Sequence, residues 1–341
     1  KLILMKMDKL NIAIIGAGRI GTRHAEHASK FGNLIAVCDN IESKSLELAT
    51  KYNCKSFSSI EKLTKSGLKV DIAAVCTPNG LHAEHSISLL NNKINVLCEK
   101  PMALSTSDCY NMILASEHNN KRLFIVKQNR FNPPVSKLKE LIDNNSLGNI
   151  FSFQLSCFWN RNNNYYDNSW KGSLDLDGGT LFTQFSHFLD LLVWMLGDVL
   201  DVEAFADNFN HKDIIEFEDT GVIILKFKNG VIGTVNYTVN SYDKNMEGSL
   251  TMFGEKGTVK IGGQYLNEIE YFSINGFDEI KIDKGNKPNN YGTYFGSMSN
   301  HGLIYENMLS ALQNNTQIST SSIEGLRTVD LIEKIYEKIR N

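Results

Sequence analysis

Five short runs of almost wholly apolar residues alternate with amphipathic stretches between residue 10 and about residue 127. The runs are Asn11–Ile15, Leu34–Cys38, Asp71–Cys76, Ile94–Cys98 and Arg122–Val126, and the amphipathic stretches include Ser43–Tyr52, His82–Asn91 and Ser105–Asn119. A continuous apolar run, rather than an alternating one, is typical of a parallel strand that is covered on both faces. Repeated strand–helix units of this length predict a doubly wound parallel sheet, the Rossmann type of α/β fold.

The pattern changes after Asn149. Longer runs joined by turns such as Lys228-Asn229-Gly230 indicate a mostly antiparallel sheet, with strands expected at Ile150–Phe158, Asp201–Ala206, Gly221–Lys228, Val231–Val239, Ser249–Phe253 and Thr258–Ile261. Helices are expected at Gly179–Leu196, His301–Asn314 and Ser322–Ile339, and a loop at Asn160–Asn168. The 341 residues suit two domains. We expect an α/β Rossmann domain over residues 1–128 and an α+β open-sheet domain with closing C-terminal helices over 129–341.

Composition excludes several classes of partner. The net charge is −3 without any block of like charges, so neither nucleic acid nor an anionic membrane surface is an expected partner. The six cysteines are scattered without a CxxC pair, and the opening Lys1–Met7 is too short for a signal peptide or a membrane span. Reduced thiols in a cytoplasmic protein are therefore expected.

A glycine fingerprint follows the first run. Gly16, Gly18 and Gly21, with Arg19 and Ile20 between them, open the helical stretch Arg19–Lys30. Glycines at this spacing allow a tight turn and let backbone approach a pyrophosphate at a helix N-terminus. Asp39 ends the second run, where a carboxylate accepts hydrogen bonds from a ribose diol and repels a 2′-phosphate. The cofactor is predicted to be NAD rather than NADP, although Arg19 is a nearby cation.

Polar residues follow the later runs. In a doubly wound sheet, ligands bind outside the carboxyl ends of the strands. We therefore expect cofactor contacts from Thr77, Pro78, Asn79, His82, Glu99, Lys100 and Gln128. An ordinary loop role is the alternative for each of them.

Lys100 stands in the tripeptide Glu99-Lys100-Pro101 at the end of a strand. Alone, such a lysine reads as a solvated strand end. Beside a nicotinamide it is a candidate acid or base, provided that burial or a nearby positive charge lowers its pKa.

The stretch Gly179–Leu196 is apolar nearly all round, which predicts a buried helix. Its polar members share one stripe: Thr180, Thr183, Gln184, His187 and Asp190. An imidazole can exchange a proton with a substrate hydroxyl near neutral pH, so His187 is the second catalytic candidate, the alternative being a core histidine with satisfied hydrogen bonds.

Metal binding is the rival use of the histidines. His24 with His27, and His82 with His85, stand three residues apart, which is not the usual spacing of a catalytic zinc site. No metal is predicted.

Together, the fingerprint, the Glu99-Lys100-Pro101 tripeptide and the Gly178-Gly179…His187-x-x-Asp190 helix resemble the glucose–fructose oxidoreductase / inositol dehydrogenase (Gfo/Idh/MocA) family. The resemblance covers nearly the whole chain. It implies Lys100 and His187 as the catalytic pair, and oligomers formed through the open sheet face. The family often has an acidic residue four positions before the histidine, and this chain has Thr183 there. The family's acidic group is therefore in doubt here.

The segment from Trp159 to Gly172 is similar to that of bacterial UDP-N-acetylglucosaminuronate 3-dehydrogenases. Arg161 and Lys171 offer positive charge to a carboxylate or diphosphate, and Tyr165 and Trp170 offer flat surfaces. A solvated loop around one buried tryptophan is the alternative. The resemblance implies substrate contacts from Arg161, Tyr165, Trp170, Lys171, Thr183, His187 and His301.

The expected function is an NAD-dependent oxidation of the 3-hydroxyl of a UDP-linked N-acetylhexosaminuronate to a ketone, by a cytoplasmic homodimer or homotetramer. One alternative is a dehydrogenase or ketoreductase of a free sugar or cyclitol. A second, of another class, is a non-catalytic NAD(H)-binding regulator on the same fold.

Overall fold

The structure is a computed structural model that describes residues 9–167, 169–278, 280–283, 285–290 and 295–340. The opening segment 1–7 lies outside these residues. The chain divides into two compact units. The first comprises residues 1–103, 107–126 and 301–323, and the second comprises residues 104–106, 127–300 and 324–341.

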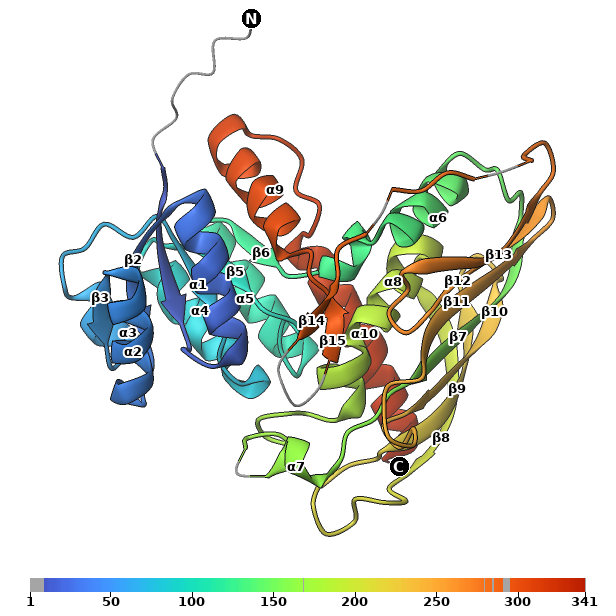
Figure 1. Cartoon of the computed structure of the whole chain (residues 1–341), viewed down its shortest axis with the longest axis horizontal. Coiled ribbons are helices and arrows are strands. Elements are labelled where there is room, and N and C mark those ends of the chain that lie inside the picture. Colours follow the sequence, from blue (N-terminus) through green and yellow to red (C-terminus); the bar gives the residue numbers. More distant parts are fainter. Residues whose placement is uncertain (1–8, 168, 279, 284, 291–294, 341) are drawn as a thin grey trace, which may run out of the picture. The chain divides into compact units, whose positions relative to one another are not determined.

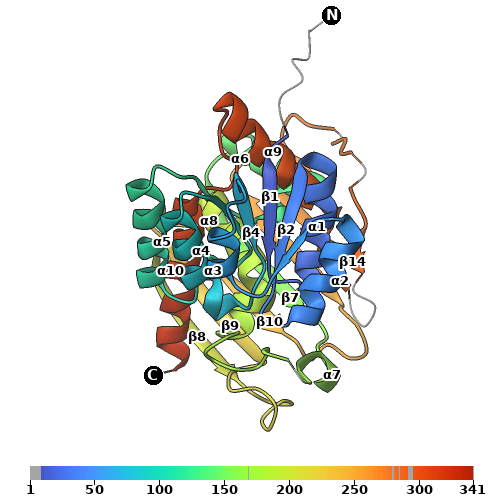
Figure 2. The same ribbon diagram turned by 90° about the vertical axis from the view of Figure 1, so that its left-hand side faces the viewer.

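The first unit is built on a six-stranded parallel sheet in the order β3-β2-β1-β4-β5-β6. Its strands are β1 (Asn11–Ile15), β2 (Asn33–Cys38), β3 (Lys55–Phe57), β4 (Ile72–Val75), β5 (Asn95–Cys98) and β6 (Leu123–Ile125). Figure 2 shows β2, β1 and β4 side by side. Side chains of β1 and β4 are almost wholly buried, as the continuous apolar runs predict.

Helices connect these strands. They are α1 (Arg19–Phe31), α2 (Glu42–Tyr52), α3 (Ile60–Thr64), α4 (His82–Asn91) and α5 (Thr106–His118), with a 3₁₀ turn, η1, at Asn79–Leu81. A late segment, α9 (His301–Asn314), packs against α1. The sequence assigns residues 301–323 to the second domain, whereas the structure places them in the first unit, because the buried side chains of α9 pack against α1.

The second unit holds a seven-stranded sheet in the order β13-β12-β11-β7-β10-β9-β8. Its strands are β7 (Ile150–Phe158), β8 (Val199–Asp207), β9 (Thr220–Phe227), β10 (Ile232–Thr238), β11 (Glu247–Gly254), β12 (Gly257–Gly262) and β13 (Glu268–Ile274). The β7–β10 pair is parallel and the other pairs of this sheet are antiparallel. A separate hairpin pairs β14 (Pro288–Asn290) with β15 (Phe295–Met298).

Helices cover one face of this sheet (Figure 1). The helical elements are η2 (Gln128–Phe131), α6 (Pro133–Asp143), α7 (Asn163–Tyr166), η3 (Leu181–Phe185), α8 (Ser186–Leu196) and α10 (Ser322–Ile339). Alternate residues of β9, such as Ile223 and Leu225, are fully buried, while Val222 and Ile224 between them are exposed. This alternation is that of a sheet with one covered and one open face.

These observations confirm the predicted fold class. One predicted helix differs in its geometry: Gly179–Leu196 is not a single α-helix, because η3 is a π-helical turn that leads into α8. A π-turn inserts one extra residue and is found frequently at functional sites. Over the described residues, no helix combines the length and the hydrophobicity that a membrane crossing needs.

Candidate active site

The glycine fingerprint forms the turn from β1 into α1. Gly16 has a φ of +95°, and a Cβ there would lie 2.7 Å from the carbonyl oxygen of Cys76. A Cβ on Gly21 would lie 1.8 Å from the carbonyl oxygen of Gly16, so the turn requires glycine at both positions. A Cβ on Gly18 would meet open space, and no side chain caps the helix there. The first N–H groups of α1 thus suit a pyrophosphate, the group that the fingerprint predicts.

Asp39 is anchored on this turn. Its Oδ2 accepts the backbone N–H of Ala17 at 2.7 Å, and its Oδ1 accepts that of Ile41 at 2.8 Å. A carboxylate oxygen has a second lone pair, so both oxygens can still accept from ribose hydroxyls. The geometry fits the NAD preference read from the sequence.

His82 joins the loops that follow β4 and β5. Its Nδ1 lies 2.7 Å from the carbonyl oxygen of Pro101, and its Nε2 lies 2.9 Å from that of Thr77. Burial lowers the pKa of His82. Thr77 also contacts Nδ1 of His85 at 3.0 Å through its hydroxyl. The structure therefore brings the Thr77 and Lys100 loops together at the carboxyl edge of the sheet, with His82 as the tie between them.

Glu99 is buried in the first unit among histidines. Its Oε1 lies 2.8 Å from Nε2 of His24 and 3.4 Å from Nε2 of His301, while its Oε2 accepts the backbone N–H of Lys100 at 3.0 Å. Burial alone raises the pKa of Glu99, but hydrogen bonds from both histidines hold it well below its usual range. The hydroxyl of Tyr305 is 3.0 Å from Nδ1 of His24 and completes the chain of contacts.

Among the described residues, His24, Glu99 and His301 are a group whose ligand atoms lie close enough for a metal ion, within 4.8 Å of one another. The short contact between His24 and Glu99 is already a direct hydrogen bond, which satisfies both groups without an ion. The expectation of no metal stays a prediction. The structure places His301 at Glu99, within the first unit, and its role in substrate binding also stays a prediction.

His187 lies on the first turn of α8 in the second unit. Nε2 of Gln128 is 3.1 Å from Nε2 of His187, and both side chains are buried. The side-chain amide of Gln128 contacts the candidate catalytic histidine, and the cofactor contact that the sequence predicts for Gln128 stays a prediction. Gln128 is thus a candidate positioning residue.

Asp190, one turn further along α8, faces a different set of partners. Its carboxylate accepts from Nε and Nη2 of Arg130 at 2.8 and 2.7 Å and pairs with Nζ of Lys127 at 3.0 Å. Burial raises the pKa of Asp190, but these two cations outweigh burial and hold the pKa well below its usual range. The aspartate of the His-x-x-Asp motif therefore fixes η2 to α8, because buried charges are stabilised only when paired.

The predicted substrate segment gathers around Arg161. Its Nε donates to Oε1 of Gln184 at 2.8 Å, and its Nη1 donates to Oδ1 of Asn245 at 3.1 Å. Nε2 of Gln184 in turn donates to the hydroxyl of Tyr165 at 2.7 Å. The Lys171 ammonium lies 3.8 Å from the Tyr165 ring centroid and 5.9 Å from that of Trp170. The structure thus brings Arg161, Tyr165, Trp170 and Lys171 together in a cationic and aromatic surface, and their contact with a substrate stays a prediction.

Sequence reasoning missed two members of this surface. Asn245 stands in the loop between β10 and β11, where no sequence pattern singles it out. Asp177 precedes the glycine pair, and its buried carboxylate accepts from the hydroxyl of Thr183 and, at 2.8 Å, from the backbone N–H of Gly172. A carboxylate therefore reaches Thr183 from outside the helix.

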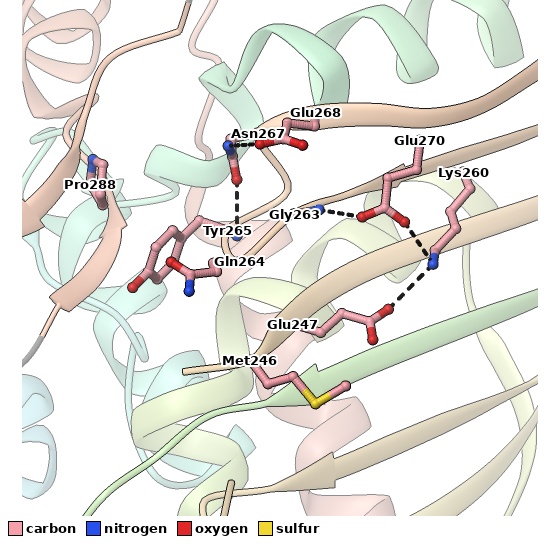
Figure 3. Close-up of a pocket in the computed structure, with 10 residues that line it drawn as sticks. All are labelled: Met246, Glu247, Lys260, Gly263, Gln264, Tyr265, Asn267, Glu268, Glu270 and Pro288. Atoms are coloured by element: carbon pink, nitrogen blue, oxygen red, sulfur yellow. Dashed lines mark hydrogen bonds and ion pairs between the residues drawn. The ribbon is translucent and has the colours of Figure 1, made fainter. Parts of the chain in front are cut away.

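A hollow of about 480 Å³ lies next to Asn245, and its lining includes Gln264 and Tyr265, which are both hydrogen-bonded to Asn245 (Figure 3). Its charged lining is Glu247, Glu268 and Glu270 around Lys260, which pairs with Glu270 at 2.7 Å and with Glu247 at 3.5 Å. The sequence-predicted site residues do not line it. An acidic lining also disfavours a diphosphate, so this hollow is not the candidate site.

Comparison with known proteins matches the two units of the chain to two domains of one family. Residues 10–127 match the family model described as "Oxidoreductase family, NAD-binding Rossmann fold", and residues 135–260 match the GFO/IDH/MocA C-terminal domain. The chain is 28% identical to myo-inositol 2-dehydrogenase of Thermotoga maritima over 73% of this chain and 74% of that protein. It is 30% identical to 2,7-anhydro-N-acetylneuraminate hydratase of Escherichia coli over 75% of this chain and 68% of that protein.

Two solved structures are similar over almost the whole chain. The WlbA dehydrogenase of Bordetella pertussis, in complex with NADH and UDP-GlcNAcA, has a TM-score of 0.87 and 31% identity, covering 98% of this chain and 97% of that one. The WlbA dehydrogenase of Chromobacterium violaceum, with the same ligands, has a TM-score of 0.88 and 32% identity, covering 98% of this chain and 95% of that one. This chain therefore belongs to the GFO/IDH/MocA family and is an NAD-dependent oxidoreductase.

Proposed function

We propose that this protein oxidises the 3-hydroxyl of a UDP-linked N-acetylhexosaminuronate to a ketone, with NAD⁺ as oxidant. The observation that carries the proposal is the similarity, over 98% of the chain, to two dehydrogenases that were crystallised with NADH and UDP-GlcNAcA. The surface of Arg161, Tyr165, Trp170 and Lys171 supports it, because guanidinium and ammonium groups suit a carboxylate or a diphosphate.

The reaction balances as one carbinol and NAD⁺ giving one ketone, NADH and a proton. NAD⁺, when bound, accepts the hydride from the carbinol carbon. The turn at Gly16–Gly21 would hold the pyrophosphate, and Asp39 the adenosine ribose. We assign the hydroxyl proton to Lys100 or His187, one as base and the other as the group that polarises the oxygen. The Glu99 carboxylate accepts the backbone N–H of Lys100 and so holds the Lys100 backbone, and the side-chain amide of Gln128 contacts the His187 ring.

The proposal is tested with purified protein, NAD⁺ and UDP-N-acetylglucosaminuronate. Without an acceptor, we expect NADH absorbance. With an added 2-keto acid, which reoxidises tightly held NADH and is itself reduced to the 2-hydroxy acid, we expect accumulation of the 3-keto product. The absence of NADH absorbance without the acceptor, together with the absence of a 3-keto product with it, would contradict the proposal.

A second candidate is a dehydrogenase of a free sugar or cyclitol. Two of the curated relatives favour it by name: myo-inositol 2-dehydrogenase, and glucose-6-phosphate 3-dehydrogenase of Bacillus subtilis at 25% identity over 97% of this chain. Equal rates with and without the UDP group would favour this candidate. Deuteride transfer from labelled NADH to any keto sugar would distinguish either of these two enzymes from a non-catalytic regulator.

We also propose that copies of the chain associate through the open face of the second sheet, in the cytoplasm. The register places Phe205 opposite Val222 on this face, and Ile224 lies two residues along β9. These three side chains are 83%, 46% and 54% exposed. An exposed apolar patch of this kind is typical of a protein interface, and a second copy is the occupant that we propose.

A further inference from the structure

The loop between β8 and β9 contacts the predicted substrate segment at both of its ends. At the first end, Nε2 of His211 lies 2.9 Å from the backbone carbonyl oxygen of Arg161. At the other end, the backbone N–H of Glu216 donates to the carbonyl of Gly172 at 2.9 Å, and the Glu216 carboxylate accepts the backbone N–H of Leu174 at 2.7 Å. This loop therefore holds the segment both before and after its aromatic residues.

Apolar side chains join the same loop to the segment. Ile215 and Phe217 of the loop form a buried cluster with Tyr166, and Tyr165 packs against this cluster. The ring of Tyr166 also meets the ring of His211 edge to face, with 5.4 Å between the two centroids. Because close-packed side chains move together, the positions of both tyrosine rings depend on the loop.

His211 is buried and faces a hydrogen-bond acceptor with each ring nitrogen. Nδ1 lies 3.0 Å from Oδ2 of Asp219, and Nε2 faces the carbonyl oxygen of Arg161, which can only accept. Burial raises the pKa of Asp219, but hydrogen bonds from the side chains of His211 and Asn240 and from two backbone N–H groups hold it well below its usual range. The carboxylate is therefore ionised and accepts as well. Both nitrogens of His211 thus donate, which makes the ring an imidazolium ion paired with Asp219.

Arg161 is the residue whose backbone the imidazolium holds. Its guanidinium lies over two aromatic rings, with Cζ 5.0 Å from the ring centroid of Trp159 and 5.1 Å from that of Tyr165. A guanidinium stacked in this way keeps its charge and suits a carboxylate or a phosphate group. Since the side chain starts from the backbone that His211 holds, a shift of the carbonyl would move the charge with it.

We propose that His211 is a positioning residue for an anionic group of the substrate, because its imidazolium ion holds the Arg161 carbonyl and so places the Arg161 guanidinium. This inference rests on the proposed function, in which Arg161 meets the carboxylate or the diphosphate of the sugar nucleotide. His211 takes no part in hydride or proton transfer in this scheme. Its loss should therefore weaken substrate binding, without slowing the chemical step and without affecting NADH, which the Gly16–Gly21 turn of the first unit would hold.

The test compares wild type with His211→Phe, Arg161→Ala and the double variant. Phenylalanine keeps a ring beside Tyr166 and removes both hydrogen bonds. Because this change leaves the charge of Asp219 without the imidazolium, His211→Gln is included as the conservative variant, whose amide can still donate to one of the two acceptors. His118→Phe is the matched control, since His118 is an exposed histidine of the first unit.

Binding and turnover are measured separately. Dissociation constants come from calorimetric titration with NADH, and then with UDP-N-acetylglucosaminuronate or UDP in the presence of NADH, so that no turnover occurs. Oxidation of the sugar nucleotide by NAD⁺ gives kcat and KM, and thermal unfolding shows whether each variant is folded.

We expect His211→Phe to raise the dissociation constant and the KM of the sugar nucleotide about tenfold, and His211→Gln about threefold, with kcat and NADH affinity unchanged. In the Arg161→Ala background, His211→Phe should cause no further loss, because residues that act through one another are not additive. An equal loss of affinity for UDP would assign the diphosphate as the anion that Arg161 meets, and a loss confined to the complete substrate would assign the carboxylate. His118→Phe should behave as wild type.

Two results would overturn the inference and leave the proposed function standing. One is a folded His211→Phe variant that binds the sugar nucleotide as tightly as wild type does. The other is a double variant in which the two losses multiply, which would mean that His211 acts independently of Arg161. If His211→Phe does not fold, the same two criteria apply to His211→Gln.

Failure of the proposed function gives a different result, because wild type itself then neither binds nor oxidises the UDP sugar. If wild type oxidises another anionic sugar, the same variants are titrated with that sugar and judged by the same criteria. If wild type oxidises uncharged sugars alone, the inference fails as well, since Arg161 then has no anion to meet.

Discussion

The side-chain amide of Gln128 donates to Nε2 of His187 across 3.1 Å. With the amide nitrogen as donor, Nε2 is an acceptor, and the neutral ring carries its proton on Nδ1. Gln128→Leu removes this donor, so we expect kcat to fall about tenfold through loss of ring orientation while the NAD(H) dissociation constant stays unchanged. Stopped-flow kinetics and NADH fluorescence titration measure the two quantities. A weaker NADH affinity with normal kcat would return Gln128 to the cofactor role that the sequence predicts.

Lys100→Met should abolish hydride transfer and leave cofactor binding intact, because the side chain is assigned to proton transfer while its backbone N–H still reaches Glu99. NADH formation in a single turnover measures hydride transfer, and an NADH fluorescence titration measures cofactor binding. Lys65→Met, at an exposed lysine of the first unit, is the control. Loss of both turnover and binding would show that Lys100 has a structural role.

Asp39→Asn should shift the cofactor preference toward NADP by about 10- to 100-fold in the ratio of kcat/KM values. The substitution removes the charge that repels a 2′-phosphate, and the remaining side-chain oxygen can still accept from Ala17 or Ile41. Initial rates over a range of both cofactors give the ratio. An unchanged ratio would mean that another group, with Arg19 the first candidate, decides the choice.

Glu218 is a buried carboxyl that accepts the Tyr336 hydroxyl at 2.8 Å, and burial raises its pKa to about 7. Its ordinary value is 4.5. Between these two values the folded state holds a proton that the unfolded state has lost, so stability falls as pH rises through this window. Above pH 7, the free energy of unfolding is lower by about 3 kcal/mol than it is below pH 4.5. Glu218→Gln should remove this slope, so that urea unfolding shows the variant more stable than wild type at pH 8.5 and similar at pH 4.5.

Ile224→Glu places a charge on the open sheet face, on β9 next to the edge strand β8, where Ile224 is 54% exposed. If copies associate through this face, the variant should be monomeric where wild type is a dimer or tetramer, as measured by light scattering after gel filtration. Leu114→Glu is the control, because this exposed leucine belongs to the first unit. An unchanged mass for Ile224→Glu would place the interface elsewhere.

Local pattern predicted most of the framework. The run Asn11–Ile15 is β1, and the predicted helices His82–Asn91, His301–Asn314 and Ser322–Ile339 have the bounds of α4, α9 and α10. These elements were predictable because apolar runs and helical periodicity are properties of neighbouring residues.

Other features depend on contacts between distant residues. Glu99 and His301 meet although 202 positions separate them (301 − 99), and no short pattern records such a contact. The π-turn at Leu181–Phe185 was missed because polar spacings of three and four residues fit an α-helix equally well. Asp177 was missed because a lone aspartate before a glycine pair reads as a turn residue.

The chain returns to the first unit at residue 301, and α9 supplies Tyr305 and His301 to the buried surroundings of His24. A ribosome adds residues from the N-terminus, and an ordinary N-terminal domain completes its fold before the next one is made. Here the nascent first unit lacks α9 until every strand of the second sheet has been made, because α9 follows all of these strands in the sequence. The first unit therefore completes its core late in synthesis, and a chain cut short before residue 301 would leave the imidazole of His24 and the carboxylate of Glu99 without these two neighbours.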